Sequence, residues 1–206
     1  MTYTTQRSAG LKSSNVICDA SPLVPIIMRR GYERGAEIGV WRGESSRYLA
    51  PLLGKLYLVD PWQPFYLAQR RGPSSLVEMD AIYYSVYGIF EHNPNVEVLR
   101  MSSVDASGIV PHDLDFVFLD AEHDYEGVKR NIAAWRGHVR RWGILCGDDY
   151  THHDNGVKRA VDEAFGDKVK HADTNTWAFF SADAAHMYNW VCRWFDRFWY
   201  VEHKDL

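Results

Sequence analysis

The sequence predicts a single α/β domain, a three-layer sandwich in which a mostly parallel seven-stranded sheet carries helices on both faces. Strand-like and helix-like apolar patterns alternate along the chain, and this alternation favours parallel strands joined by crossover helices. A polar or acidic residue ends almost every predicted strand. The chain has 206 residues, of which 46% are hydrophobic, enough for one domain with a sizeable core.

The predicted strands are short apolar runs bounded by glycine, proline or polar residues. Leu114–Asp120, with the sequence L-D-F-V-F-L-D, shows this pattern most clearly. The other strands, in chain order, are 36–40, which ends at glycine; 55–60, K-L-Y-L-V-D; 96–100; 143–146; and a terminal antiparallel pair over 168–172 and 176–180.

The predicted helices carry apolar residues three and four positions apart. The strongest pattern covers Glu126–Trp142, where one apolar stripe contains Val128, Ile132, Trp135, Val139 and Trp142. The other helices, in chain order, are 22–30, which Gly31 ends; 44–53, which Gly54 ends; 76–90; 156–165, with Val157, Val161 and Phe165 facing inward; and the aromatic segment 184–200.

Three segments lie outside the regular pattern of the single domain 1–206. Residues 1–21 form an N-terminal extension, and residues 61–75, rich in proline, glycine and aromatics, form a lid or insert. Residues 184–206 contain the aromatic C-terminal helix, which is expected either in the core or at the interface of a homodimer.

The composition of the chain indicates which kinds of partner and which cellular compartment to expect. A formal net charge of −4 argues against a nucleic-acid partner, which usually requires a basic face. The N-terminus has no apolar signal-peptide core, and no apolar run reaches the ~18 residues of a membrane span. Three cysteines without disulfide-framework spacing indicate reduced thiols. We therefore expect a cytoplasmic protein with no membrane partner.

A glycine-containing turn follows the first strand, in the sequence Glu37-Ile-Gly39-Val-Trp-Arg-Gly43. The glycines let a ligand approach the backbone, and the helix opening near Gly43 presents free N–H groups to a carboxylate such as that of a methionine moiety. Glu37 is a candidate acceptor for the ammonium group. Asp60 ends the next strand, where an acid accepts ribose hydroxyls. The combination predicts an adenosine-type ligand, although each feature alone is also typical of a simple turn, and G-x-G-x-x-G is absent.

With these residues, the chain resembles class I S-adenosylmethionine-dependent methyltransferases, which have a Rossmann-like fold. E-I-G-V-W-R-G is similar to their first motif, and L-V-D-P-W to their acidic second loop. F-L-D-A-E-H-D-Y-E-G-V-K-R-N-I, G-I-L-C-G-D-D-Y and G-V-K-R-A-V-D-E-A-F resemble the small-molecule group that contains macrolide-sugar O-methyltransferases and cephalosporin-biosynthesis-type proteins. The resemblance covers about residues 31–180 and implies S-adenosyl-L-methionine as cofactor. The candidate cofactor-binding residues are Glu37, Gly39, Gly43, Asp60, Ser103 and Asp120.

Three acids follow two neighbouring strands, Asp120 after one and Asp148 and Asp149 after the next. Adjacent strand ends bring such side chains close together, and three carboxylates cannot all remain ionised there without a cation. A divalent ion, Mg²⁺ or Mn²⁺, resolves the conflict and would lower the pKa of a bound substrate hydroxyl. The resemblance implies the same metal role. The alternative is that Asp148 caps a helix and Asp149 serves only in a turn.

The resemblance also implies a general base three residues after the strand-end acid, where this chain has His123. A near-neutral imidazole suits that role, whereas catechol-type relatives use lysine, so Glu122 remains the second candidate. The catalytic candidates are therefore His123, Asp120 and Glu122. Weaker candidates are Ser102 for adenine, the aromatic residues Trp62, Phe65 and Tyr66 for stacking or loop packing, and His152 and His153 for the acceptor pocket or extra metal ligands.

These residues together predict a divalent-metal-assisted O-methyltransferase whose acceptor is a hydroxyl on a sugar, glycan or other small polyhydroxyl molecule. Two alternatives stay open at this point. One is a metal-independent N- or O-methyltransferase, and the other is a module that binds S-adenosylmethionine without catalysis.

Overall fold

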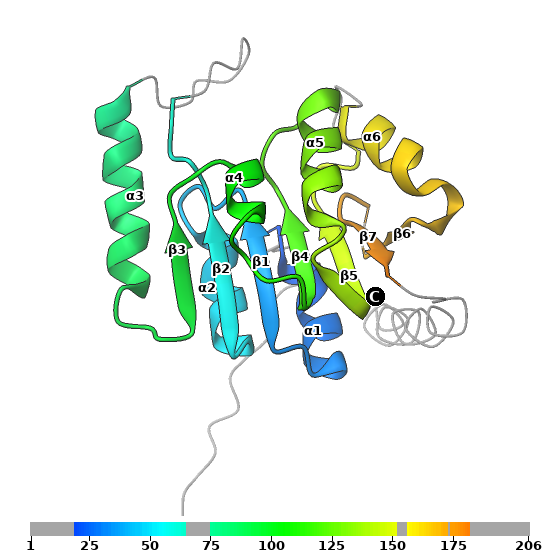
Figure 1. The fold of residues 1–206 in the computed structure, drawn as a ribbon, viewed down its shortest axis with the longest axis horizontal. Coiled ribbons are helices and arrows are strands. Elements are labelled where there is room, and N and C mark those ends of the chain that lie inside the picture. The colour runs from blue at the N-terminus through cyan, green and yellow to red at the C-terminus, as the bar shows by residue number, and fades with distance from the viewer. Residues whose placement is uncertain (1–18, 65–74, 152–155, 173, 182–206) are drawn as a thin grey trace, which may run out of the picture.

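The structure, a computed structural model, describes residues 19–64, 75–151, 156–172 and 174–181 (Figure 1). Its seven strands form one sheet in the order β3-β2-β1-β4-β5-β7-β6. Within the described chain the pairings of β7 with β5 and with β6 are antiparallel, and all the other pairings are parallel. The predicted fold class is therefore confirmed. The strands are β1 (Arg34–Ile38), β2 (Lys55–Val59), β3 (Val96–Leu99), β4 (Leu114–Leu119), β5 (Val139–Gly147), β6 (Lys170–His171) and β7 (Trp177–Phe180).

Helices cover both faces of the sheet and make two separate cores. One core lies between the sheet and α1, α2 and α3, and the other lies between the sheet and α4, α5 and α6. In Figure 1, α4 and α5 lie in front of the strands. The helices are α1 (Val24–Arg30), α2 (Glu44–Leu49), α3 (Leu76–Phe90), α4 (Ser103–Ser107), α5 (Tyr125–Trp135) and α6 (Gly156–Phe165), with 3-10 turns at Ser21–Leu23, Ala50–Leu52 and Gly166–Lys168.

The central strand β4 shows why the apolar pattern of this sheet is continuous rather than alternating. Every residue of Leu114–Leu119 is buried, because helices cover both faces of the strand. Side chains on one face, such as Phe116 and Phe118, enter the first core, and those on the other, such as Val117, enter the second.

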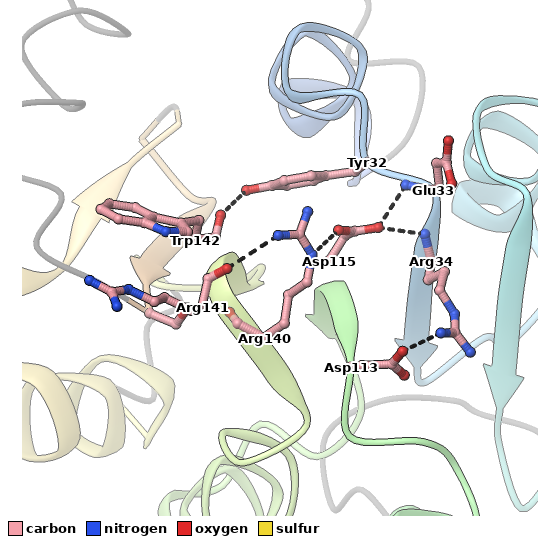
Figure 2. A network of polar contacts seen from close by, with 9 residues as sticks. Tyr32, Glu33, Arg34, Asp113, Asp115, Arg140, Arg141 and Trp142 are labelled. Carbon is pink, nitrogen blue, oxygen red and sulfur yellow. Dashed lines mark hydrogen bonds and ion pairs between the residues drawn. The ribbon is translucent and has the colours of Figure 1, made fainter.

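The predicted boundary between α5 and β5 is wrong. The helix ends at Trp135 instead of Trp142, and the strand begins at Val139 instead of Gly143. The apolar stripe continues at helical spacing past Gly137, but Val139 pairs with Leu114 of β4. The gain from sheet pairing outweighs helix propensity across a glycine. Trp142 consequently lies within β5 at a φ of 72°, and its carbonyl accepts a hydrogen bond from the Tyr32 hydroxyl at 2.9 Å (Figure 2).

Other elements differ less from expectation. β1 begins and ends two residues before the predicted 36–40, and the predicted helix 44–53 is α2 followed by the 3-10 turn at Ala50–Leu52. The helix α4 was not predicted. The antiparallel pairing of β6 with β7 is confirmed. The predicted helix 184–200 and most of the 1–21 and 61–75 segments lie outside the described residues. Among the helices that are described, none is both long and apolar enough to cross a membrane.

The amino ends of the strands are joined by a buried carboxylate, Asp115 (Figure 2). Asp115 is 5% exposed, and its carboxylate accepts hydrogen bonds from the backbone N–H groups of Glu33 and Arg34, at 2.7 and 2.8 Å. The Arg140 guanidinium pairs with its other oxygen. The Asp115 side chain thus connects the first residues of β1, β4 and β5. This contact lies at the amino ends of these strands, away from the carboxyl ends where a ligand is expected.

Candidate functional site

The candidate residues gather where β1 and β4 lie side by side, at the point where the strand order changes direction. In open α/β sheets this crevice beyond the carboxyl ends is the usual ligand position. The Asp120 N–H donates to the Ile38 carbonyl at 2.8 Å, so the loop after β4 rests directly on the end of β1. A Cβ atom at Gly39 would overlap the Asp120 carbonyl oxygen. Glycine at this position therefore lets the two loops touch.

The glycine loop has a fixed shape. Gly39 and Gly43 have φ angles of 90° and 72°, in the region that favours glycine. Gly43 precedes α2 as its N-cap residue, and its N–H donates to the Val40 carbonyl at 2.8 Å. The predicted strand-to-helix turn is thus present, with both glycines required by backbone conformation.

Asp60 organises this loop. One carboxylate oxygen accepts from the N–H groups of Val40 and Trp41, each at 3.0 Å, and the other accepts from the Trp62 N–H at 2.6 Å. Burial raises the pKa of Asp60, and these three donors act against the rise. A carboxylate has about four acceptor positions, so about one remains for a ligand. The predicted ribose role therefore remains a prediction, beside a structural role that the sequence did not reveal.

Trp62 packs into the protein rather than toward a ligand. Its side chain is completely buried, its indole N–H donates to the Trp41 carbonyl at 2.9 Å, and its ring lies 5.1 Å from that of Tyr83. The guanidinium of Arg100 lies 4.6 Å above the Tyr83 ring and donates to the Trp62 carbonyl at 3.5 Å. Of the two roles considered for Trp62, the structure supports loop packing. Trp62 connects α3 to the glycine loop, while Phe65 and Tyr66 lie outside the described residues.

Glu37 is a buried carboxyl group beneath the glycine loop. It is 1% exposed and accepts a hydrogen bond from the Ser46 hydroxyl of α2 at 2.7 Å. Burial raises the pKa of Glu37 well above its ordinary value, and the nearby Asp120 and Asp60 raise it further. Such an environment favours either the neutral acid or a cation bound nearby.

Three side chains after β4 and β5 come together at the centre of the site. Asp120, His123 and Asp149 each offer one ligand atom, and these atoms lie within 4.8 Å of one another. The Nε2 atom of His123 lies 3.6 Å from Asp120 Oδ1 and 3.3 Å from Asp149 Oδ2. Asp149 has a φ of 60°, an uncommon backbone conformation for a residue other than glycine. Two of the three predicted acids thus form a cluster with the predicted base.

The third predicted acid, Asp148, has different partners. Its carboxylate accepts from the Asn175 amide at 2.9 Å and from the Thr176 hydroxyl at 3.4 Å. Both donors lie in the turn just before β7. Because β7 pairs antiparallel with β5, with Trp177 opposite Gly147, this turn lies beside Asp148. Sequence reasoning missed Asn175 and Thr176, because only the position of β7 in the sheet places that turn at the site.

The carboxyl groups of this site are difficult to ionise. Burial raises the pKa of Asp120 to about 6, and the hydrogen bond from His123 opposes this rise. Burial raises the pKa of Asp148 to about 7, with further contributions from the charges of Asp120, Asp19 and Asp149. Acids held close together without a compensating positive charge are typical of functional sites.

Comparison with known proteins identifies the family of the chain. Residues 36–150, more than half of the chain, match a family described as a methyltransferase domain. The chain belongs to this methyltransferase family. It is a class I S-adenosylmethionine-dependent methyltransferase, as its sequence motifs predicted. No curated protein matches the sequence of the chain.

Solved structures share the fold of this methyltransferase. The O-methyltransferase NovP is 18% identical, with a TM-score of 0.60 over 77% of this chain and 76% of NovP. An O-methyltransferase from Bacillus cereus in complex with SAH is 17% identical, with a TM-score of 0.56 over 78% of this chain and 79% of that one. At these identities the likeness is one of fold.

Two further candidates of the methyltransferase contact α5. Glu122 accepts a hydrogen bond from the Asn131 amide at 2.7 Å, and the Arg130 guanidinium lies 3.6 Å from its carboxylate. The Ser103 hydroxyl accepts from the Trp135 indole at 2.8 Å, and Ser102 caps α4 by accepting from the Asp105 N–H at 3.2 Å. The Ser103 hydroxyl can still donate to adenine, so its predicted role remains a prediction. His152 and His153 lie outside the described residues.

Proposed function

We propose that this methyltransferase transfers the methyl group of S-adenosylmethionine to a hydroxyl oxygen with the help of a divalent cation. The observation that carries the proposal is the contact between the two halves of the site. Asp120 and His123 of the Asp120–His123–Asp149 cluster lie on the loop after β4, which rests against Gly39 of the cofactor turn. An acceptor held at the cluster would therefore lie beside a methyl donor held at the turn.

The reaction needs an activated oxygen. A neutral alcohol is a poor nucleophile toward a methyl carbon, so its proton must pass to a base as the new bond forms. The acceptor oxygen bonds to the methyl carbon while the carbon–sulfur bond of the sulfonium breaks. The products are a methyl ether, S-adenosylhomocysteine and a protonated base. His123 and Glu122, both on the loop after β4, are the candidate proton acceptors.

The side chains present fit a divalent cation. Two carboxylates and an imidazole within 4.8 Å of one another form an ordinary ligand set. The raised pKa values of Asp120 and Asp148 indicate carboxyl groups that a positive charge would stabilise. A bound cation would supply Lewis acidity, which lowers the pKa of an acceptor hydroxyl.

We propose a sugar, glycan or other small polyhydroxyl compound as the acceptor. A cation in this site would favour an acceptor with neighbouring hydroxyl groups, because two such oxygens can take the place of water ligands. The sequence motifs that resemble macrolide-sugar O-methyltransferases support the same class.

Cofactor binding and turnover test the two parts of the proposal separately. Calorimetry should detect S-adenosylmethionine and S-adenosylhomocysteine binding, and Asp60→Ala should weaken it by about 1.5–3 kcal/mol, as lost hydrogen bonds to a charged group do. A screen of hydroxyl acceptors should give methyl transfer that stops in excess chelator and returns with Mg²⁺ or Mn²⁺. Full turnover in chelator would instead indicate a metal-independent methyltransferase, and cofactor binding without any turnover would indicate a binding module.

A further inference from the structure

We propose that the cation is held by Asp120, His123 and Asp149, with the imidazole as a direct ligand, and that the site prefers Mn²⁺ or a similar first-row transition ion over Mg²⁺. This inference rests on the metal-assisted function proposed above. It replaces the three-carboxylate site expected from the sequence, in which Asp148 is a ligand and His123 is a base.

The separations among the three groups suit one shared ion. Metal–ligand bonds of about 2.1 Å place neighbouring ligand atoms about 3 Å apart and opposite ones about 4 Å apart. The His123 Nε2 atom lies 3.3 Å from Asp149 Oδ2 and 3.6 Å from Asp120 Oδ1, and all three ligand atoms lie within 4.8 Å of one another. Small movements of the side chains would bring all three atoms onto one ion.

The backbone and the β6–β7 turn aim Asp149 at this position. The φ of 60° at Asp149 turns its side chain toward the loop after β4. The amide of Asn175 approaches the other carboxylate oxygen, Oδ1, at 3.4 Å. The carboxylate therefore directs Oδ2 toward His123, in the orientation that a ligand requires.

Asp148 is held for a different purpose. Both of its oxygens accept hydrogen bonds, from Asn175 at 2.9 Å and from Thr176 at 3.4 Å. It also lines a cavity of about 10 Å³, which it shares with Glu122, His123, Asn131, Trp177 and apolar side chains. Because both of its oxygens already have donors from the turn before β7, Asp148 supports the position of the cluster and is not one of its ligands.

The imidazole determines which ion is preferred. Mg²⁺ is a hard ion that binds oxygen ligands and keeps much of its water shell. Imidazole nitrogen favours the first-row transition ions, which follow the order of affinity from Mn²⁺ upward. Two carboxylates suit Mn²⁺ as well, so this mixed set favours Mn²⁺ over Mg²⁺. If His123 binds the ion, Glu122 remains of the two candidate proton acceptors.

Electron spin echo spectroscopy of the full chain with Mn²⁺ alone tests the ligand assignment directly. Nitrogen bound to Mn²⁺ produces a ¹⁴N modulation, which should change when histidine is labelled with ¹⁵N. A bound Mn²⁺ without histidine nitrogen coupling would overturn the inference. This measurement needs no substitution, so it does not depend on the folding of a variant.

Variants assign the nitrogen to one residue. His123→Ala should abolish the modulation and weaken Mn²⁺ binding at least tenfold, since even changes around a ligand cost about 10–100-fold. His92→Ala is the matched control, because that histidine side chain is 93% exposed on the turn after α3 and should leave both measurements unchanged. A modulation that persists in His123→Ala would assign the nitrogen elsewhere and contradict the proposal.

Substitutions of Asp148 and Asp149 distinguish the proposed site from a site of three carboxylates. Asp149→Asn should weaken Mn²⁺ binding much more than Asp148→Asn, which keeps one oxygen acceptor for its partners on the turn before β7. Equal losses would support the three-carboxylate site instead. In competition, a large excess of Mg²⁺ should be needed to displace Mn²⁺, and displacement at equal concentrations would also contradict the inference. Methyl transfer that continues in chelator would defeat the metal-assisted function itself, which is a different result.

Discussion

Two aspartates at opposite ends of β4 have opposite surroundings. Asp115, at the amino end, accepts two backbone hydrogen bonds and pairs with Arg140 (Figure 2). Asp120 follows the carboxyl end, where burial and neighbouring acids raise its pKa to about 6. The difference shows that the two ends of β4 have different roles. Groups at the amino end are satisfied within the protein and support the fold, whereas groups at the carboxyl end would be satisfied by a ligand.

The largest effect on stability is expected at Asp115. Asp115→Ala leaves two part-buried N–H groups and the half-exposed Arg140 guanidinium without this acceptor, and we expect a loss of about 2–3 kcal/mol in the free energy of unfolding. Urea denaturation measures it. Asp113→Ala is the control, because Asp113 pairs with Arg34 at side-chain exposures of 58% and 41% and should cost at most about 1 kcal/mol. Similar losses in both variants would remove the distinction between the ends.

Asp120→Asn should reduce methyl transfer without reducing stability, in contrast to Asp115→Ala. Replacing this carboxylate removes a charge that burial disfavours, so the free energy of unfolding should not fall. Methyl transfer should fall on the order of 10²-fold or more, since Lewis-acid help contributes several kcal/mol to the barrier. Steady-state rates and urea denaturation of the same sample measure both. A destabilised variant with normal turnover would show that Asp120 supports the fold as Asp115 does.

The raised pKa values at the carboxyl end of the sheet should make stability depend on pH. The pKa values of Asp120 and Asp148 rise from 3.8 to about 6 and about 7, so the folded protein binds protons more readily than the unfolded chain. In the metal-free protein, the contribution of these two groups to stability should therefore decrease as the pH rises from about 4 to about 7. Thermal denaturation across this range measures the trend. The double variant Asp120→Asn and Asp148→Asn should weaken it, and an unchanged slope would refute the assignment.

The smallest effect is expected at Trp62. Trp62→Phe keeps a buried ring but loses the hydrogen bond to the Trp41 carbonyl, so S-adenosylmethionine should bind about 1 kcal/mol more weakly. Calorimetry should be carried out with the cofactor and, separately, with Mn²⁺. Only the affinity for the cofactor should change. Tyr84→Phe is the control on α3, where that side chain is 65% exposed. Equal weakening of both ligands would indicate a general loss of structure.

Much of this molecule could be predicted from local pattern. The buried strand β4, the helices α3 and α6 and the terminal β6–β7 pair each carry their periodicity within a few residues, and the structure has them close to the predicted positions. The end of α5 was missed because the apolar stripe continues through Gly137, and only the pairing of Val139 with Leu114 shows that a strand has begun.

The site was predictable as a set of strand-end residues but not as a set of contacts. Asp120, His123 and Asp149 lie together because β4 and β5 are neighbours, which the alternation of strands and helices already indicated. The partners of Asp148 come from the turn before β7, and their position depends on an antiparallel pairing that local pattern does not specify. The hydrogen bonds of Asp60 to Val40 and Trp41 could not be predicted either, because they join residues about twenty positions apart that only the pairing of β1 with β2 brings together.

A crystal structure with Mn²⁺ and S-adenosylhomocysteine, recorded with manganese anomalous scattering, would locate the cation and the cofactor product together. We predict one strong anomalous peak bonded to Asp120, His123 and Asp149, with S-adenosylhomocysteine on the loop between Gly39 and Gly43 and its sulfur facing the ion. An anomalous peak away from these side chains, or S-adenosylhomocysteine bound elsewhere on the protein, would contradict it.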